Sequence, residues 1–208
     1  MNEALWLTTN STREMIQYVA DWTSERKLRL FACAFCRRIL HMMRYYGSQQ
    51  AVEVSERFAD GQCSSAELQR SEGEARYWAD IAEREGLPGW HAARMAALST
   101  AQNARTAAEG AWIVDADHVR ELFGNPFHPL TLSPSILSWN DSTVVRLAQA
   151  AYDERNLPKG TLDKGRLAIL ADALEEAGCT DEQILGHLRG NERHYRGCFV
   201  VDALLGKT

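Results

Sequence analysis

Hydrophobic and basic positions separate at helical spacing through residues 26–46. At about 100° per residue, the apolar side chains of this tract share one broad arc of a helix, and the basic side chains fall opposite. The apolar members are Leu28, Phe31, Ala32, Phe35, Cys36, Ile39, Met42 and Met43, and the opposite members are Arg26, Arg37, Arg38, His41 and Arg44. This pattern predicts a long amphipathic helix with one buried face.

The same spacing recurs along most of the chain, with start and stop signals between the segments. Ser64 followed by Glu67 matches a capping box, and Gly47 and Gly178 each follow a helical stretch that a glycine would end. Helices are predicted over 11–23, 25–46, 48–60, 65–85, 89–110, 115–123, 141–155, 164–177, 180–189 and 197–205. No segment shows convincing strand alternation, so we expect an all-α protein, a multi-helix bundle of about nine to ten helices.

The main break in this pattern is residues 124–140, which contain three of the five prolines. A continuous helix is excluded there, yet side chains such as Phe127 and Trp139 make the segment too apolar for a free linker. We therefore predict an ordered, proline-rich loop held against the core. The whole chain, 1–208, is then one helical domain, or two lobes, 1–123 and 141–208, joined by 124–140.

Composition narrows the class of protein further. The formal net charge of −5 argues against a protein that binds nucleic acid through bulk positive charge. No stretch is long and apolar enough for a membrane span, and the first residues lack the basic and apolar regions of a signal peptide. Five cysteines are an odd number in a chain with ample core-forming residues, so reduced thiols and a cytoplasmic location are expected.

Several sequence blocks carry a family resemblance, which extends over nearly the whole chain. They are residues 26–33, 51–54, 123–127, 168–179 and 196–202. Taken together, these blocks resemble a large paralogous family of planctomycete-type bacterial proteins with no assigned activity. The resemblance implies a shared fold and a non-enzymatic accessory role in bacteria, and it transfers no catalytic residue. The chain departs from the family pattern at Phe35 and Leu188, where related sequences commonly show additional cysteines.

Two groups of residues contain zinc-ligand types. The C-terminal group is Cys179, His187, His194 and Cys198, and the N-terminal pair is Cys33 and Cys36. Thiolate and imidazole are the ligands of tetrahedral zinc, but the C-terminal residues are spread over separate predicted elements, and the N-terminal pair lies in the middle of a helix. Zinc is thus an alternative to the simpler interpretation, in which no cofactor is bound and these side chains pack in the core or remain exposed.

The basic side chains Arg26, Arg37, Arg38 and Arg44 form the strongest cationic strip. They could contact phosphates, but Glu25, Glu53 and Glu56 lie close by in sequence and offer neutralising partners. Intramolecular pairing or solvation is therefore favoured, and nucleic-acid binding through residues 26–44 is kept as a second alternative.

No known catalytic signature stands out in the chain. There is no Gly-x-Ser-x-Gly, no His-Glu-x-x-His and no phosphate-cradling glycine loop. We therefore expect a non-enzymatic protein that binds another, unidentified protein as an adaptor or regulator, without a membrane. The candidate interaction residues are Arg26, Arg37, Arg38, Arg44, Phe127 and Trp139.

Overall fold

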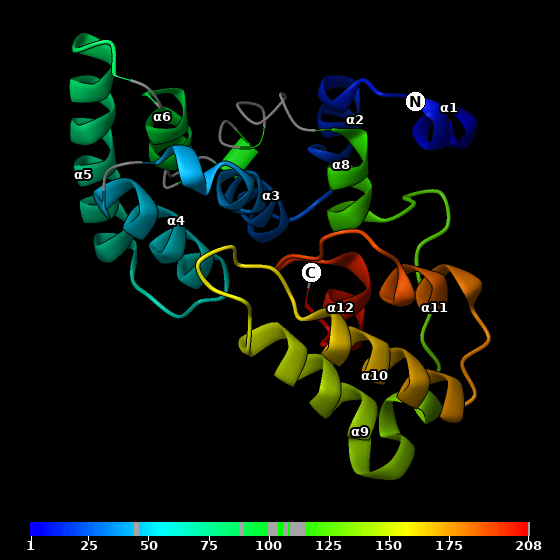
Figure 1. The fold of residues 1–208 in the computed structure, drawn as a ribbon. Coiled ribbons are helices and arrows are strands. Elements are labelled where there is room, and N and C mark those ends of the chain that lie inside the picture. The colour runs from blue at the N-terminus through cyan, green and yellow to red at the C-terminus, as the bar shows by residue number, and fades with distance from the viewer. Residues whose placement is uncertain (44–45, 88–89, 100–103, 106–107, 109–114, 208) are drawn as a thin grey trace. The chain divides into compact units, whose positions relative to one another are not determined.

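Helices make up the regular secondary structure of the chain, which confirms the all-α prediction (Figure 1). The computed structural model describes residues 1–43, 46–87, 90–99, 104–105, 108 and 115–207. Within these residues, extended backbone pairing is confined to isolated bridges, Asn156 with Thr161 and Thr161 with Tyr195. In the same part of the chain, no helix has both the length and the apolar composition that crossing a bilayer requires.

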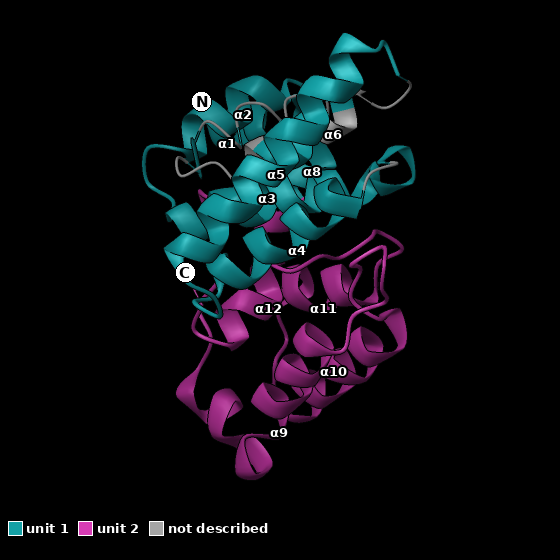
Figure 2. Cartoon of the chain, turned by 90° about the vertical axis from the view of Figure 1, so that its left-hand side faces the viewer, with its two compact units in different colours: residues 1–120 teal, residues 121–208 magenta. Residues whose placement is uncertain are grey.

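The chain divides into two compact units, residues 1–120 and 121–208 (Figure 2). The helices of unit 1 are α1 (Glu3–Thr8), α2 (Thr12–Val19), α3 (Glu25–Arg38), a 3-10 turn (Leu40–Met42), α4 (Tyr46–Ala59), α5 (Ser65–Arg84) and α6 (Trp90–Ser99). Helix α8 (Ala116–Phe123) begins in unit 1 and ends in unit 2. The helices of unit 2 are α9 (Pro134–Asp153), α10 (Lys164–Glu176), α11 (Glu182–Arg189) and α12 (Phe199–Leu204).

Helix α3 lies among other helices of unit 1 and packs against α4 and α6. Burial extends around this helix beyond the predicted apolar face, because residues 27–37 are all buried. Of the two expectations for its basic residues, pairing within the protein holds for Arg37. The Arg37 guanidinium lies inside because it donates to both carboxylate oxygens of Glu56, at 3.0 and 2.8 Å. A buried charge of either sign is tolerated when such a partner neutralises it.

The helix predicted over 25–46 is shorter than expected. It ends at Arg38, and the next residues form the 3-10 turn. Gly47, predicted as a stop signal, lies instead inside α4, where the ring of Trp78 packs against it. A Cβ atom at position 47 would lie 2.7 Å from Trp78 Cδ1, so the glycine serves close packing and not helix termination. The other example behaved as predicted: Gly178 follows α10 with a φ of 90°.

Small side chains hold α4, α5 and α6 together. Their shared cluster consists of Ala51, Ala75, Ala79 and Ala97. Alanine permits close approach of helix axes, so these small side chains let the three helices pack tightly. The helix predicted over 89–110 is described as α6 to Ser99, and most of its remainder lies outside the described residues.

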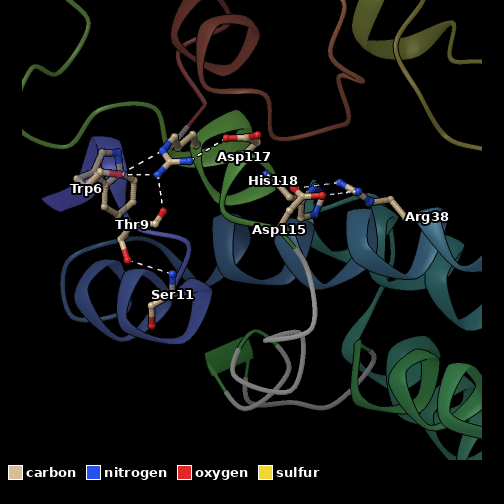
Figure 3. Close-up of polar contacts among 8 residues, drawn as sticks. Trp6, Thr9, Ser11, Arg38, Asp115, Asp117 and His118 are labelled. Atoms are coloured by element: carbon tan, nitrogen blue, oxygen red, sulfur yellow. Dashed lines mark hydrogen bonds and ion pairs between the residues drawn. The ribbon is translucent and has the colours of Figure 1, made fainter. Parts of the chain in front are cut away.

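Helix α8 is fixed within unit 1 by polar contacts at its start and middle (Figure 3). Arg120 donates to the backbone carbonyl oxygens of Trp6 and Thr9, at 2.8 and 2.7 Å from Nη2. Asp115, immediately before the helix, pairs with Arg38 at 2.6 Å and accepts a bond from the His118 amide. These contacts anchor the helix that carries Glu121 one residue further on.

Unit 2 has its own apolar core, formed mainly by α9, α10, α11 and α12. The loop predicted over 124–140 ends early, because α9 already begins at Pro134, where the first helical turn tolerates proline. The same helix is interrupted at residues 139–142, and Asn140, Asp141 and Ser142 have positive φ. Ile136 is buried in the core and Trp139 packs against it, so this segment is held in place as expected.

Candidate metal centre

Four side chains with metal-ligating atoms meet inside unit 2. They are Glu121 at the end of α8, His187 on α11, and His194 and Cys198 in the segment before α12. Their ligand atoms all lie within 4.8 Å of one another. A search of the described residues for three or more His, Cys, Asp or Glu side chains close enough to share one ion finds this group.

Helix α11 presents His187 because of how the helix begins and which face it buries. The Asp181 carboxylate caps the helix by accepting bonds from the amides of Gln183 and Ile184. Ile184, Leu185 and Leu188 are buried in the unit 2 core, and this fixes the rotation of the helix about its axis. His187 lies between the last two of these positions, with 16% of its side chain exposed.

Backbone hydrogen bonds hold the segment after α11, from which both His194 and Cys198 reach the cluster. The His194 carbonyl accepts a bond from the Leu162 amide at 2.8 Å. The Cys198 amide donates to the Tyr195 carbonyl at 3.0 Å, and Cys198 is the residue that precedes α12. Gly197 between them has a φ of 91°, a conformation that other residues rarely adopt.

The contacts converge on a few atoms. Glu121 Oε2 lies 3.0 Å from His187 Nε2 and 3.0 Å from His194 Nδ1. Cys198 Sγ lies 3.3 Å from the same His187 nitrogen and 3.9 Å from the same His194 nitrogen. The other carboxylate oxygen, Glu121 Oε1, accepts a bond from the Tyr195 amide.

These spacings suit a tetrahedral ion. With ordinary zinc–ligand distances, tetrahedral geometry separates nitrogen from oxygen by roughly 3.4 Å and nitrogen from sulfur by roughly 3.6 Å. The four observed separations, 3.0, 3.0, 3.3 and 3.9 Å, each lie within about 0.4 Å of these values. The cluster therefore has the size of a single four-coordinate zinc site.

The electrostatics of the site favour an anionic carboxylate. Burial alone would raise the pKa of Glu121, but the hydrogen bonds and charges of His187 and His194 outweigh it and lower this pKa to about 2. The site is also secluded, since Cys198 and the His194 side chain are fully buried. An ionised oxygen that faces two imidazoles and a thiol, largely shielded from solvent, is an arrangement that could hold a metal cation.

A thiol nucleophile activated by histidine is a different use of the same residue types, and the geometry does not support it. Such a site needs one ring nitrogen toward the nucleophile and the other toward the orienting carboxylate. Here the same nitrogen of His187 faces both Cys198 and Glu121, and the same is true of His194. Contacts that point inward from all four groups are typical of ligands around one ion.

An aromatic ring supports His187 from outside the cluster. The ring of Phe199 lies 4.4 Å from that of His187, centroid to centroid. Phe199 in turn packs against Gly124, where a Cβ atom would lie 2.7 Å from the phenyl Cδ2. Gly124 also has a φ of 65°, so both its backbone and the ring above it require glycine.

The structure brings together three of the six residues that the sequence suggested as zinc ligands: His187, His194 and Cys198. Cys179 belongs to the apolar core of unit 2 and is not a member of the cluster. Cys33 and Cys36 are buried in α3 of unit 1, and burial raises the pKa of Cys33 to about 12. A neutral, buried thiol of this kind is a packing group.

Glu121 is the member that sequence reasoning missed. A glutamate in a short amphipathic helix is usually solvated, and nothing in its spacing relates it to residues more than sixty positions later. Its immediate sequence context holds one weak signal, since the apolar pair Leu122 and Phe123 and then Gly124 follow it directly. Only the fold shows that Glu121 is 5% exposed and faces two histidines.

The suggested interaction residues lie outside this site. Arg26 pairs with Asp60 at 3.1 Å, Arg37 with Glu56, and Arg38 with Asp115. Arg44 lies outside the described residues. Phe127 and Trp139 are half-buried, so neither is a freely exposed anchor.

Comparison of the chain with protein-family models, curated proteins and solved structures finds no match. The fold and the site therefore define it as an all-α protein with a Glu-His-His-Cys cluster in its second unit.

Proposed function

We propose that residues 121–208 are a zinc-binding module, in which one metal ion joins the end of α8 to α11 and to the start of α12. The observation that supports this most directly is the convergence of four ligand atoms within 4.8 Å in a buried site. The ligands come from sequence positions up to 77 apart, so the ion would close a long loop of the chain.

The donor set favours zinc over other ions. One thiolate and two imidazoles are borderline-soft ligands, whereas calcium and magnesium prefer oxygen. Four protein ligands fill a tetrahedral shell and leave no position for water or substrate. The proposed role is accordingly structural, as in a non-enzymatic module, and the thiol ligand suits a cytoplasmic protein with reduced cysteines.

Metal analysis of the full-length protein, purified without chelator, tests this proposal. We expect one zinc per chain, and Co²⁺ substitution should give the visible spectrum of a tetrahedral site with a sulfur-to-cobalt band. Cys198→Ser should abolish that band and most of the zinc. Cys179→Ser is the matched control, because Cys179 is also buried in unit 2 but lies outside the cluster.

Substoichiometric metal, together with a thermal stability that chelation leaves unchanged, would refute the zinc module. An equal loss of metal in both cysteine variants would also contradict it, since the effect would then come from disturbed packing.

Protein binding remains a second candidate function, supported by exposed apolar side chains in unit 1. Trp22 is 52% exposed, and its ring contacts Tyr18, which in turn contacts the buried Trp6. An exposed tryptophan braced by other rings is typical of an interaction anchor. Affinity capture from the native host with wild type and Trp22→Asp tests this: a stoichiometric protein should be retained by the first and lost by the second, and equal recovery would count against Trp22.

Nucleic-acid binding through residues 26–44 receives no comparable support. Each described arginine of the strip has a carboxylate partner within the protein. Phosphate binding would have to break these pairs, and the Arg37–Glu56 pair is buried.

A further inference from the structure

A surface groove lies between the start of α4 and the middle of α5 in unit 1, with a volume of about 630 Å³. We call it the aromatic groove; it is bounded by Tyr46, Gly47, Gln50, Gly73, Glu74, Tyr77 and Trp78. Tyr46 is 75% exposed and Tyr77 is 61% exposed. Two exposed rings therefore lie together on this part of the surface.

Two of the rings that line the groove contact each other edge to face. The rings of Tyr77 and Trp78 lie 5.4 Å apart at 73°. Trp78 is held in place because it packs against Gly47, where any side chain would overlap it. On the α5 side, Gly73 adds no side chain, and a Cβ atom there would meet nothing within 4 Å.

The charge that lines the aromatic groove is negative. Among the described residues that line the groove, Glu74 is the charged one, and none of them carries a cationic side chain. The neighbouring Arg76 points to another partner, Glu72, at 2.7 Å. Among the described residues Glu74 has no ion pair, and it lies three and four positions before Tyr77 and Trp78 on the same face of α5.

From this arrangement we propose that the aromatic groove binds a quaternary ammonium group. The faces of aromatic rings attract cations, and tryptophan does so most strongly. A quaternary ammonium has no N–H groups, so it needs no hydrogen-bond acceptors, and ring faces with one carboxylate nearby satisfy it. A guanidinium or primary ammonium would need an acceptor for each N–H group, and ring faces do not supply strong acceptors.

Calorimetric titration of the full-length protein with choline, and with its neutral isostere 3,3-dimethylbutan-1-ol, tests the proposal. The two probes have the same shape, so only the charge distinguishes them. We expect saturable binding of choline that is at least about tenfold tighter than that of the alcohol. Equal binding of both probes, or no saturable binding of choline, would overturn the proposal.

Variants localise the site. Tyr77→Leu and Glu74→Gln should each weaken choline binding by at least about threefold, whereas Trp22→Leu, which removes an exposed ring outside the groove, should leave it unchanged. Both groove positions are exposed, so these variants should keep the helical circular dichroism of the wild type. Unchanged affinity in Tyr77→Leu would refute the assignment.

A peptide with trimethyllysine separates the two sources of such a cation. Tighter binding of the peptide than of choline would identify a modified protein partner, and equal affinity would identify a small molecule; both results support the ammonium site. The inference does not depend on zinc, because the groove belongs to unit 1. Choline should therefore bind Cys198→Ser as it binds the wild type.

Discussion

Glu121 shows how a single buried charge can indicate function. A carboxylate in the protein interior is costly unless partners neutralise it, and Glu121 has two imidazoles within 3.0 Å of one oxygen. Ion pairs of purely structural type, such as Arg37 with Glu56, also occur in this chain. What distinguishes Glu121 is that its partners, with Cys198, are all metal-ligand types facing one point.

Replacing the charge while keeping the shape tests this residue. Glu121→Gln should lower zinc affinity by at least about a hundredfold, because a neutral amide is a poor zinc ligand. A competition titration against a chromophoric chelator measures the change. Glu176→Gln, at an exposed position on α10, is the control and should leave the affinity unaltered; similar losses in both variants would argue against Glu121 as a ligand.

Cysteine reactivity tests whether Cys33 is a buried, protonated thiol. Burial raises the pKa of Cys33 to about 12, so below that pH its sulfur remains a protonated thiol. In the native protein at pH 8, iodoacetamide should modify Cys63, which is half-exposed, well before Cys33, as read by peptide mass spectrometry. Comparable labelling of the two would show that α3 opens readily.

At the scale of elements, the predictions that depended on local patterns were mostly confirmed. The all-α class, the start of α5 at the Ser64–Glu67 box and the helix near 115–123 all follow from side-chain periodicity and capping. Pairing of the basic residues of α3 within the protein was expected, and Arg37 does pair with Glu56 on α4. The burial of residues 27–37 was not expected, because periodicity describes one helix at a time and cannot show which of its faces other helices will cover.

The candidate site was also predicted only in part from the sequence. His187, His194 and Cys198 were recognised by residue type, and they lie within twelve positions of one another. Cys179 has the same chemistry but lies in the apolar core, and Glu121 comes from a distant helix. Residue type indicates which chemistry is available, whereas tertiary packing decides which members meet.

The loop between α8 and α9 makes a testable link from backbone to site. Gly124→Ala should destabilise the protein by about 2 kcal/mol or more, because alanine disfavours positive φ and its Cβ would overlap Phe199. Gly178→Ala is the matched control: its φ is 90°, but a Cβ there meets nothing within 4 Å, so it should show only the backbone cost.

Urea denaturation measures both glycine variants. The excess for Gly124 over Gly178 reports the displacement of Phe199, and zinc affinity should fall only in the Gly124 variant because Phe199 supports His187. Equal destabilisation of the two variants, with unchanged zinc affinity in both, would show that Phe199 does not support His187.

On the scale of the whole molecule, each unit is compact, and the proposed metal belongs to one of them. Zinc that binds only the folded state stabilises it by about 4 kcal/mol when the free metal is a thousandfold above Kd. Hydrogen exchange followed by mass spectrometry should show slower exchange in α11 and α12 on adding zinc. Helices α4 and α5 should change little, and Cys198→Ser should remove the effect; uniform protection of both units would contradict a site confined to unit 2.

Two adjacent residues of α8, Arg120 and Glu121, make their contacts in different units. Arg120 is bound to carbonyl groups of residues 6 and 9, and Glu121 faces the two histidines. Inserting one amino acid between them would rotate the second by about 100° around the helix axis relative to the first. The stretch from 115 to 124 should therefore tolerate exchanges of residue type far better than any change in its length, and alignments of divergent copies should be free of gaps there.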